Sequence, residues 1–93
     1  MLGLMAHQRK LERIVKGFAN HRRIEILQLL DRSPEISVFE ISDALRVNFK
    51  TISEHTRRLA LAGLVEKRYE GKIVRHKASS LGKLILKFLR MLE

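Results

Sequence analysis

The side chains best suited to chemistry lie in the stretch "NFKTISEHTRRLALAGLV", residues 48–65. Helical spacing places Ile52 and Leu59 together on one apolar side of this stretch. The other side carries cations and hydroxyl groups, at Lys50, Ser53, Arg57 and Arg58. Such groups donate hydrogen bonds and neutralise negative charge, which is the chemistry that recognises a polyanion. We therefore interpret this face as a binding surface.

The charge of the chain indicates the same kind of partner. Among 93 residues, 19 are Lys or Arg and 10 are Asp or Glu, so the formal net charge is +9. Residues 49–77 carry 8 basic and 3 acidic side chains, which places +5 of this charge within 29 residues. A basic excess concentrated in one segment is typical of nucleic-acid binding.

Composition excludes several other classes of protein. The chain has no cysteine, which excludes disulfides and thiolate chemistry and fits a reducing cytoplasm. No apolar run approaches the ~20 residues of a membrane span, and residues 1–16 do not read as a signal peptide. We find no paired carboxylates, activated nucleophile or phosphate loop, so we expect no enzyme, no cofactor and no small-molecule substrate.

The elements that must position the binding face follow from periodicity and capping. Helices are expected over about 4–18, from Asn20 to about 32, from the capping box Ser37–Glu40 to 45, and from Asn48 to 62. Two short strands are expected around Glu70-Gly71, followed by a last helix that Ser79 caps.

This order predicts one domain, residues 1–93, that is mainly α with a small β-hairpin (α+β). A helix-turn-helix over about 37–62, a wing over about 64–78 and a last helix over about 79–92 make a winged helix-turn-helix. In the second helix Ile24, Leu27 and Leu30 should face inward while Arg23, Gln28 and Arg32 stay more exposed. In the third, the buried face should consist of Val38, Ile41, Ala44 and Leu45.

Three segments give the chain a family resemblance. "FANHRRIEILQLL", "RVNFKTISEHTRRLALAGLV" and the wing "YEGKIVRHKASSLG" resemble the corresponding segments of ArsR-type winged-helix transcriptional repressors, and the resemblance covers about residues 10–82. It implies a homodimer that places one recognition helix per subunit in successive major grooves. In that family a metal or another effector often releases the DNA.

The resemblance also assigns candidate DNA contacts. It places Phe49, Lys50, Ser53 and Glu54 toward the DNA groove, Thr51 against the DNA backbone and Lys72 at the wing tip. Two more cations complete the candidate set, Arg57 on the recognition helix and Arg68 on the wing. Free N–H groups at the start of the recognition helix suit phosphate.

Several residues depart from the family pattern. Phe49 replaces a polar residue and either contacts a thymine methyl group or packs. Glu54 either reads cytosine or, the favoured use, pairs with Arg57 or Arg58 along the helix. Arg46 stands where a turn glycine is usual, so it must tolerate strain if its backbone is left-handed. Thr56 replaces a core leucine.

The resemblance does not extend to the metal sites. Ser37 and Phe39 stand where the family has its thiolate ligands, and the last helix offers no Asp or His ligand, so we expect no metal site. His21 and Glu25 are too few donors for a tetrahedral site. His76 is expected to pack against the wing, and His55 either packs or contributes to specificity.

The last helix predicts a subunit interface. Its wide apolar face comprises Leu81, Leu84, Ile85, Phe88, Leu89 and Leu92, opposite Lys83, Lys87 and Arg90. Part of this face should remain exposed in one small domain unless a partner covers it. We expect it to pair with the first helix of a second subunit, at Leu4 and Leu11; an anionic membrane surface is the alternative partner.

Together these observations predict a cytoplasmic, nucleoid-associated homodimer that binds double-stranded DNA at an inverted repeat. The recognition helix should enter the major groove and the wing should meet the flanking backbone, as in a repressor. The alternatives are a winged helix that binds a protein or a membrane surface, and an architectural protein that binds DNA without sequence preference.

Overall fold

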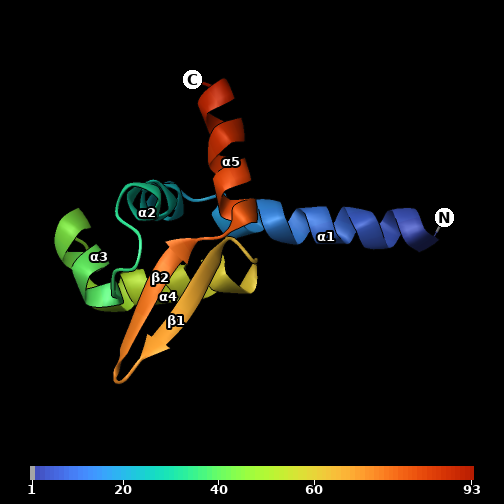
Figure 1. Cartoon of the computed structure of the whole chain (residues 1–93). Helices are drawn as coiled ribbons and strands as arrows, with labels where there is room; N and C mark the ends of the chain where they lie inside the picture. The colour runs from blue at the N-terminus through green and yellow to red at the C-terminus, as the bar shows by residue number, and fades with distance from the viewer. Residues whose placement is uncertain (1) are drawn as a thin grey trace.

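The computed structural model describes residues 2–93, with side chains from His7 onward. Its elements are α1 (Leu2–Phe18), α2 (His21–Arg32), α3 (Val38–Leu45), α4 (Phe49–Leu61), β1 (Val65–Glu70), β2 (Ile73–Ala78) and α5 (Ser80–Met91). The predicted winged helix-turn-helix is confirmed: five helices with a two-stranded antiparallel hairpin between α4 and α5 (Figure 1). No described helix combines the length and the apolar character needed to cross a membrane.

The helix boundaries follow from the predicted caps. The side chains of Asn20, Ser37, Asn48 and Ser79 each accept hydrogen bonds from the first turn of the helix that follows. Ser37 and Glu40 form a complete capping box. Because these bonds satisfy N–H groups that a helix leaves without partners, short polar residues in the sequence mark the helix starts accurately.

One apolar core joins α2, α3, α4 and the hairpin. Its fully buried members include Ile26, Leu27 and Leu30 of α2, Ile41 of α3, and Ile52 and Leu59 of α4, with Leu64 at the entry to β1. The predictions for Leu27, Leu30 and Ile41 are correct. Ile24 is only half-buried and Ala44 is exposed, so the predictions that these two residues face inward were wrong.

Three further expectations are corrected by the structure. The hairpin turn is Gly71-Lys72, one residue later than expected, because Glu70 pairs with Ile73. Gly71 has a φ of 61°, the conformation that the first residue of a type II′ turn requires. In α2, Arg23 and Gln28 are half-buried rather than exposed, and Leu86 of α5 packs into the core although it was not predicted to be part of the apolar face.

The two terminal helices extend away from this core. In Figure 1, α1 runs outward from the body and α5 rises beside it, while the hairpin points in another direction. Near its C-terminal end α1 is anchored by Gly17, which lies against the Ala62 side chain, and by the buried Phe18. Residues 7–13 of α1 are exposed, so this part of the helix contributes little to the core.

A close approach of two backbones fixes α5. A Cβ atom added at Gly82 would overlap the carbonyl oxygen of Leu64, and Ser79 reinforces the contact because its N–H donates to the same carbonyl at 3.0 Å.

We predict that Gly82→Ala destabilises the fold by about 1–3 kcal/mol in urea unfolding, since overpacking outweighs the gain in helix propensity. Lys83→Ala, at the exposed neighbouring position, is the control and should leave stability nearly unchanged. Equal effects of both changes would contradict a tight contact.

Candidate nucleic-acid interface

The turn between α3 and α4 orients the recognition helix. Arg46 adopts the left-handed conformation, φ 56° and ψ 45°, so it carries the strain expected where the family has glycine. Ser42 braces the turn twice: its hydroxyl donates to the Val47 carbonyl at 2.6 Å, and its own carbonyl accepts from the Val47 N–H at 3.2 Å. These bonds hold α4 at a defined angle to α3.

The first turn of α4 presents the side chains that sequence analysis assigned to DNA. Phe49, Lys50, Thr51 and Ser53 are all exposed, whereas Ile52 is fully buried and anchors the helix. The N–H groups of Lys50 and Thr51 donate to the Asn48 side chain, at 2.8 and 3.4 Å. Two of the N–H groups expected to be free for phosphate are therefore occupied, and side chains must supply most of the contacts here.

Glu54 organises the cations on the next turn. Its carboxylate accepts hydrogen bonds from Arg57 at 3.0 and 2.7 Å and from Arg58 at 3.0 Å. The bonds from Arg57, followed by those from Arg58, lower the pKa of Glu54 to about 2. Because the folded-state pKa is depressed, these bonds stabilise the fold above the ordinary carboxyl pKa and are lost only as pH falls toward 2. The favoured use of Glu54, pairing along the helix, is the one observed.

A buried residue of α4 departs from the family pattern without leaving a gap in hydrogen bonding. Thr56 is 2% exposed, and its hydroxyl donates to the Ser53 carbonyl at 2.9 Å. His55 is half-buried, with its Nδ1 atom enclosed and unpaired, and burial lowers its pKa. The nearby charges of Arg23 and Arg58 lower its pKa further.

The wing is attached to the helix-turn-helix by main-chain hydrogen bonds. The Glu35 N–H donates to the His76 carbonyl, and the His76 N–H donates to the Ile36 carbonyl, both at 2.8 Å. The His76 ring is buried as expected, with Nδ1 3.1 Å from that same carbonyl, and burial lowers its pKa. This short pairing of Ile36 with His76 was not predicted; Glu35 makes it possible by adopting a left-handed φ of 66°.

Ion pairs reinforce the wing, and its two predicted DNA-binding cations, Arg68 and Lys72, differ in whether they take part in these pairs. Arg75 donates to the Glu70 carboxylate at 2.7 Å and to the Glu35 carbonyl at 3.1 Å. Arg68 is 3.1 Å from the Glu35 carboxylate and 3.3 Å from that of Glu70. Lys72, in the turn, is exposed and has no ion pair among the described residues. Lys72 is therefore available to an external anion, whereas the charge of Arg68 is already partly neutralised by its carboxylates.

The wing tip and the start of the recognition helix lie beside one cleft. This cleft has a volume of about 320 Å³ and is lined by residues of α3, α4 and β2, namely Ser37, Val38, Phe39, Phe49, Lys72, Ile73 and Val74. The structure thus brings Phe49 and Lys72 together although they are far apart in sequence. Phe39 and Ile73, which sequence analysis did not assign to the interface, belong to the same surface.

A separate apolar surface lies on α1 and α5. Leu11 and Val15 of α1 are 47% and 51% exposed, and the large apolar side chains exposed on α5 and at its C-cap are Leu84, Phe88, Met91 and Leu92. Of the predicted interface residues, Leu81 and Ile85 are instead half-buried against the core, and Leu4 lies outside the residues whose side chains the structure describes. The apolar face of α5 is therefore divided between its own core and an uncovered surface.

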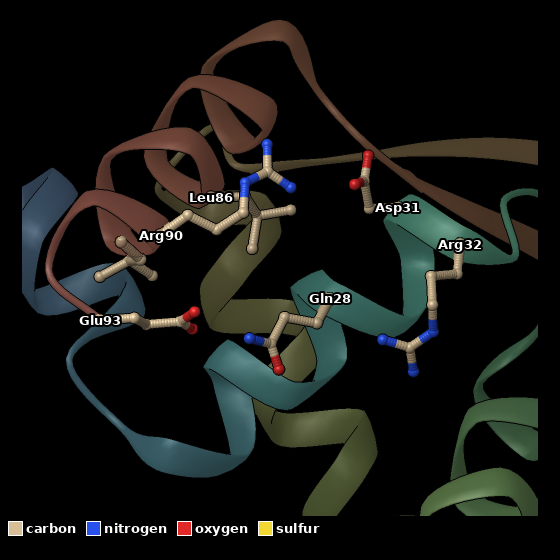
Figure 2. Close-up of a pocket in the computed structure, with 7 residues that line it drawn as sticks. Gln28, Asp31, Arg32, Leu86, Arg90 and Glu93 are labelled. Atoms are coloured by element: carbon tan, nitrogen blue, oxygen red, sulfur yellow. The ribbon is translucent and has the colours of Figure 1, made fainter.

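A shallow cleft of about 310 Å³ lies between α2 and α5 (Figure 2). Gln28, Asp31 and Arg32 of α2 face Leu86, Arg90 and Glu93 across it. This lining contains no histidine or hydroxyl nucleophile. Within the described part of the chain, no three His, Asp or Glu side chains are grouped so that they could hold a metal ion.

Comparisons with known proteins agree with this geometry. Residues 20–67, which are 48 of the 93 residues, match the family described as "Bacterial regulatory protein, arsR family". The chain belongs to the ArsR family. It is thus a DNA-binding transcriptional regulator from a family that is not enzymatic. A comparison with curated protein sequences found no match.

Solved structures extend the likeness over nearly the whole chain. The homodimeric winged helix-turn-helix domain of Mb0332 from Mycobacterium bovis, a possible ArsR-family regulator, is 29% identical over 95% of this chain and 82% of that one, with a TM-score of 0.86. Reduced HlyU from Vibrio cholerae is 30% identical over 99% and 97% of the two chains, with a TM-score of 0.80. The regulator HlyU from Vibrio vulnificus is 31% identical over 97% and 94%, with a TM-score of 0.74.

A substitution of Glu54 tests whether its carboxylate limits the contribution of Arg57 and Arg58 to DNA binding. Glu54→Gln should raise affinity for random duplex DNA and steepen its salt dependence, because Arg57 and Arg58 are released and a charge that repels phosphate is removed. Glu12→Gln is the control: it changes the net charge equally, at an exposed α1 residue 3.8 Å from Lys16. Fluorescence anisotropy at several salt concentrations measures both. If the two variants gained affinity equally, the effect would be one of net charge alone.

Proposed function

We propose that this ArsR-family regulator is a cytoplasmic, homodimeric repressor that binds an inverted-repeat DNA site. The observation that carries the proposal is the convergence of the exposed first turn of α4 and the unpaired wing-tip Lys72 on one surface. A helix start in the major groove can read base edges, while a wing cation holds the flanking backbone. The repressor role rests on the resemblance to ArsR-type repressors, and loss of reporter transcription on expression of the protein tests it.

The division of labour on the surface follows from the chemistry of each side chain. Ser53 and Lys50 are exposed on α4 and can reach base edges, with Thr51 on the adjacent backbone. Lys72 contributes a point charge for phosphate. Arg57 and Arg68 are paired with carboxylates in the free protein, so part of the charge that each could offer to DNA is already neutralised.

The dimer is supported by the apolar surface that the chain leaves uncovered. The exposed α5 side chains and the exposed stripe of α1, at Leu11 and Val15, belong to the two helices that extend from the body in Figure 1. A second subunit that covers both helices would remove this area from water and stabilise the dimer by the hydrophobic effect. The homodimeric state of the Mycobacterium bovis domain also supports a dimer.

Substitutions at Lys72 and Ser53 should separate contacts that hold DNA from contacts that read its sequence. Lys72→Ala should weaken binding to all DNA sequences alike, because it removes one phosphate contact. It should also lower the salt slope, which is the slope of the logarithm of the binding constant against the logarithm of the salt concentration, by about one per subunit. Ser53→Ala should leave the salt slope unchanged and cost roughly 1–3 kcal/mol on the preferred site only. Sites selected from a random pool should be inverted repeats with half-sites about one helical turn apart. Equal weakening of specific and random DNA by both variants would indicate an architectural binder.

Substitutions on α5 test the subunit interface. Phe88→Glu should give a monomer or an insoluble chain, because a charge would be buried without a partner. Phe88→Ala, a milder change, should raise the dimer dissociation constant without loss of solubility. Lys87→Glu, at the neighbouring exposed position, is the control and should remain dimeric. Light scattering over a concentration series measures all three, and a dimer of unchanged stability in both Phe88 variants would move the interface elsewhere.

A further inference from the structure

The cleft at the wing tip exposes an unusual amount of apolar surface. Phe39 is 70% exposed, Phe49 is 52% exposed and Ile73 is 46% exposed. All three line the same cleft of about 320 Å³, and the half-buried Val38 and Val74 line it with them. These large side chains stand at or near the start of α3, α4 and β2. Three elements therefore converge to build an apolar surface on the outside of the domain.

This surface is not explained by the core or by the expected subunit interface. Ile41 and Ile52, close to Phe39 and Phe49 in sequence, already supply the buried contacts of α3 and α4. The uncovered stripe on α1 and α5 is elsewhere: in Figure 1 those helices extend in directions different from that of the hairpin. The cleft instead includes Phe49, the first residue of α4, the helix that carries the exposed Lys50 and Ser53.

We infer that Phe49, supported by Phe39 and Ile73, contacts the 5-methyl group of thymine and selects thymine in each half-site. This inference rests on the proposed function and names part of its specificity. The 5-methyl group of thymine is the apolar group that base pairs present in the major groove. Lys72 in the same cleft supplies a charge for a neighbouring phosphate, so the occupant combines an apolar group with nearby negative charge, as a nucleotide does.

The three side chains have different parts in this contact. Phe49 is the first residue of α4, the end of the helix that enters the groove, so its ring is placed to reach a base. Phe39 and Ile73 lie beside the same cleft and would exclude water around the ring and the methyl group. Excluding water from both apolar groups makes the contact favourable. Phe49 is thus a specificity-determining residue, and the other two are positioning residues.

Replacing thymidine with deoxyuridine tests the inference directly. Their bases, thymine and uracil, have the same hydrogen-bonding groups and differ by the methyl group alone. On a site selected from random DNA, deoxyuridine at the contacted positions should weaken binding about fourfold per methyl group, since burying one such group contributes ~0.8 kcal/mol. Phe49→Ala should bind both duplexes equally, and Phe39→Ala should reduce the discrimination. The affinity ratio between the two duplexes is compared between each variant and the unaltered protein, and this comparison cancels any effect of the missing methyl on DNA itself.

A matched aromatic residue provides the control. Tyr69 on β1 is 72% exposed and does not line the cleft, so Tyr69→Ala should retain the full discrimination between thymine and deoxyuridine. A selected site without thymine in its half-sites, or equal affinity of the unaltered protein for both duplexes, overturns the inference while leaving specific DNA binding intact. Absence of any preferred site overturns the proposed function, and this inference with it.

Discussion

The pairing of Glu35 and Ile36 with His76 is the constraint on which the interface depends. Two main-chain hydrogen bonds of 2.8 Å join the segment before α3 to the middle of β2. A hairpin of two strands has little stability by itself in water, so its orientation must come from an attachment to the rest of the domain. Because the attachment involves backbone atoms close to the α3 N-terminus, the wing and the helix-turn-helix move as one unit. The cleft shared by Phe49 and Lys72 exists for this reason.

Electrostatics then decides which cations are ready for DNA. The chain has an excess of basic residues, yet several of them are paired: Arg57 and Arg58 with Glu54, and Arg68 and Arg75 with Glu70. Exposed pairs of this kind contribute little to stability. Their effect is on geometry and charge, since a paired arginine has a defined position and a partly neutralised charge. Lys50 and Lys72 lack such a carboxylate among the described residues, and they carry the freely available charge of the interface.

The apolar surfaces of the domain serve two different purposes in this interpretation. The stripe on α1 and α5 is broad and belongs to helices that reach beyond the core, which suits a second subunit. The patch at Phe39, Phe49 and Ile73 is small and lies next to cations, which suits a nucleotide. The core includes neither surface, because Leu64 and Leu86 supply its apolar contacts where the hairpin and α5 meet the body. A small domain can thus carry two binding surfaces without weakening its interior.

The sequence by itself determined the elements and their chemistry, because caps, periodicity and charge act over a few residues. Asn20, Ser37, Asn48 and Ser79 mark helix starts through bonds within one turn, and the pairing of Glu54 follows from helical spacing. The tertiary structure alone decided what depends on distant contacts. Neither the exposure of Ala44 nor the burial of Leu86 follows from local spacing, because both depend on which neighbour covers each face. The pairing of Ile36 with His76 joins residues 40 positions apart, and no local signal specifies such a contact.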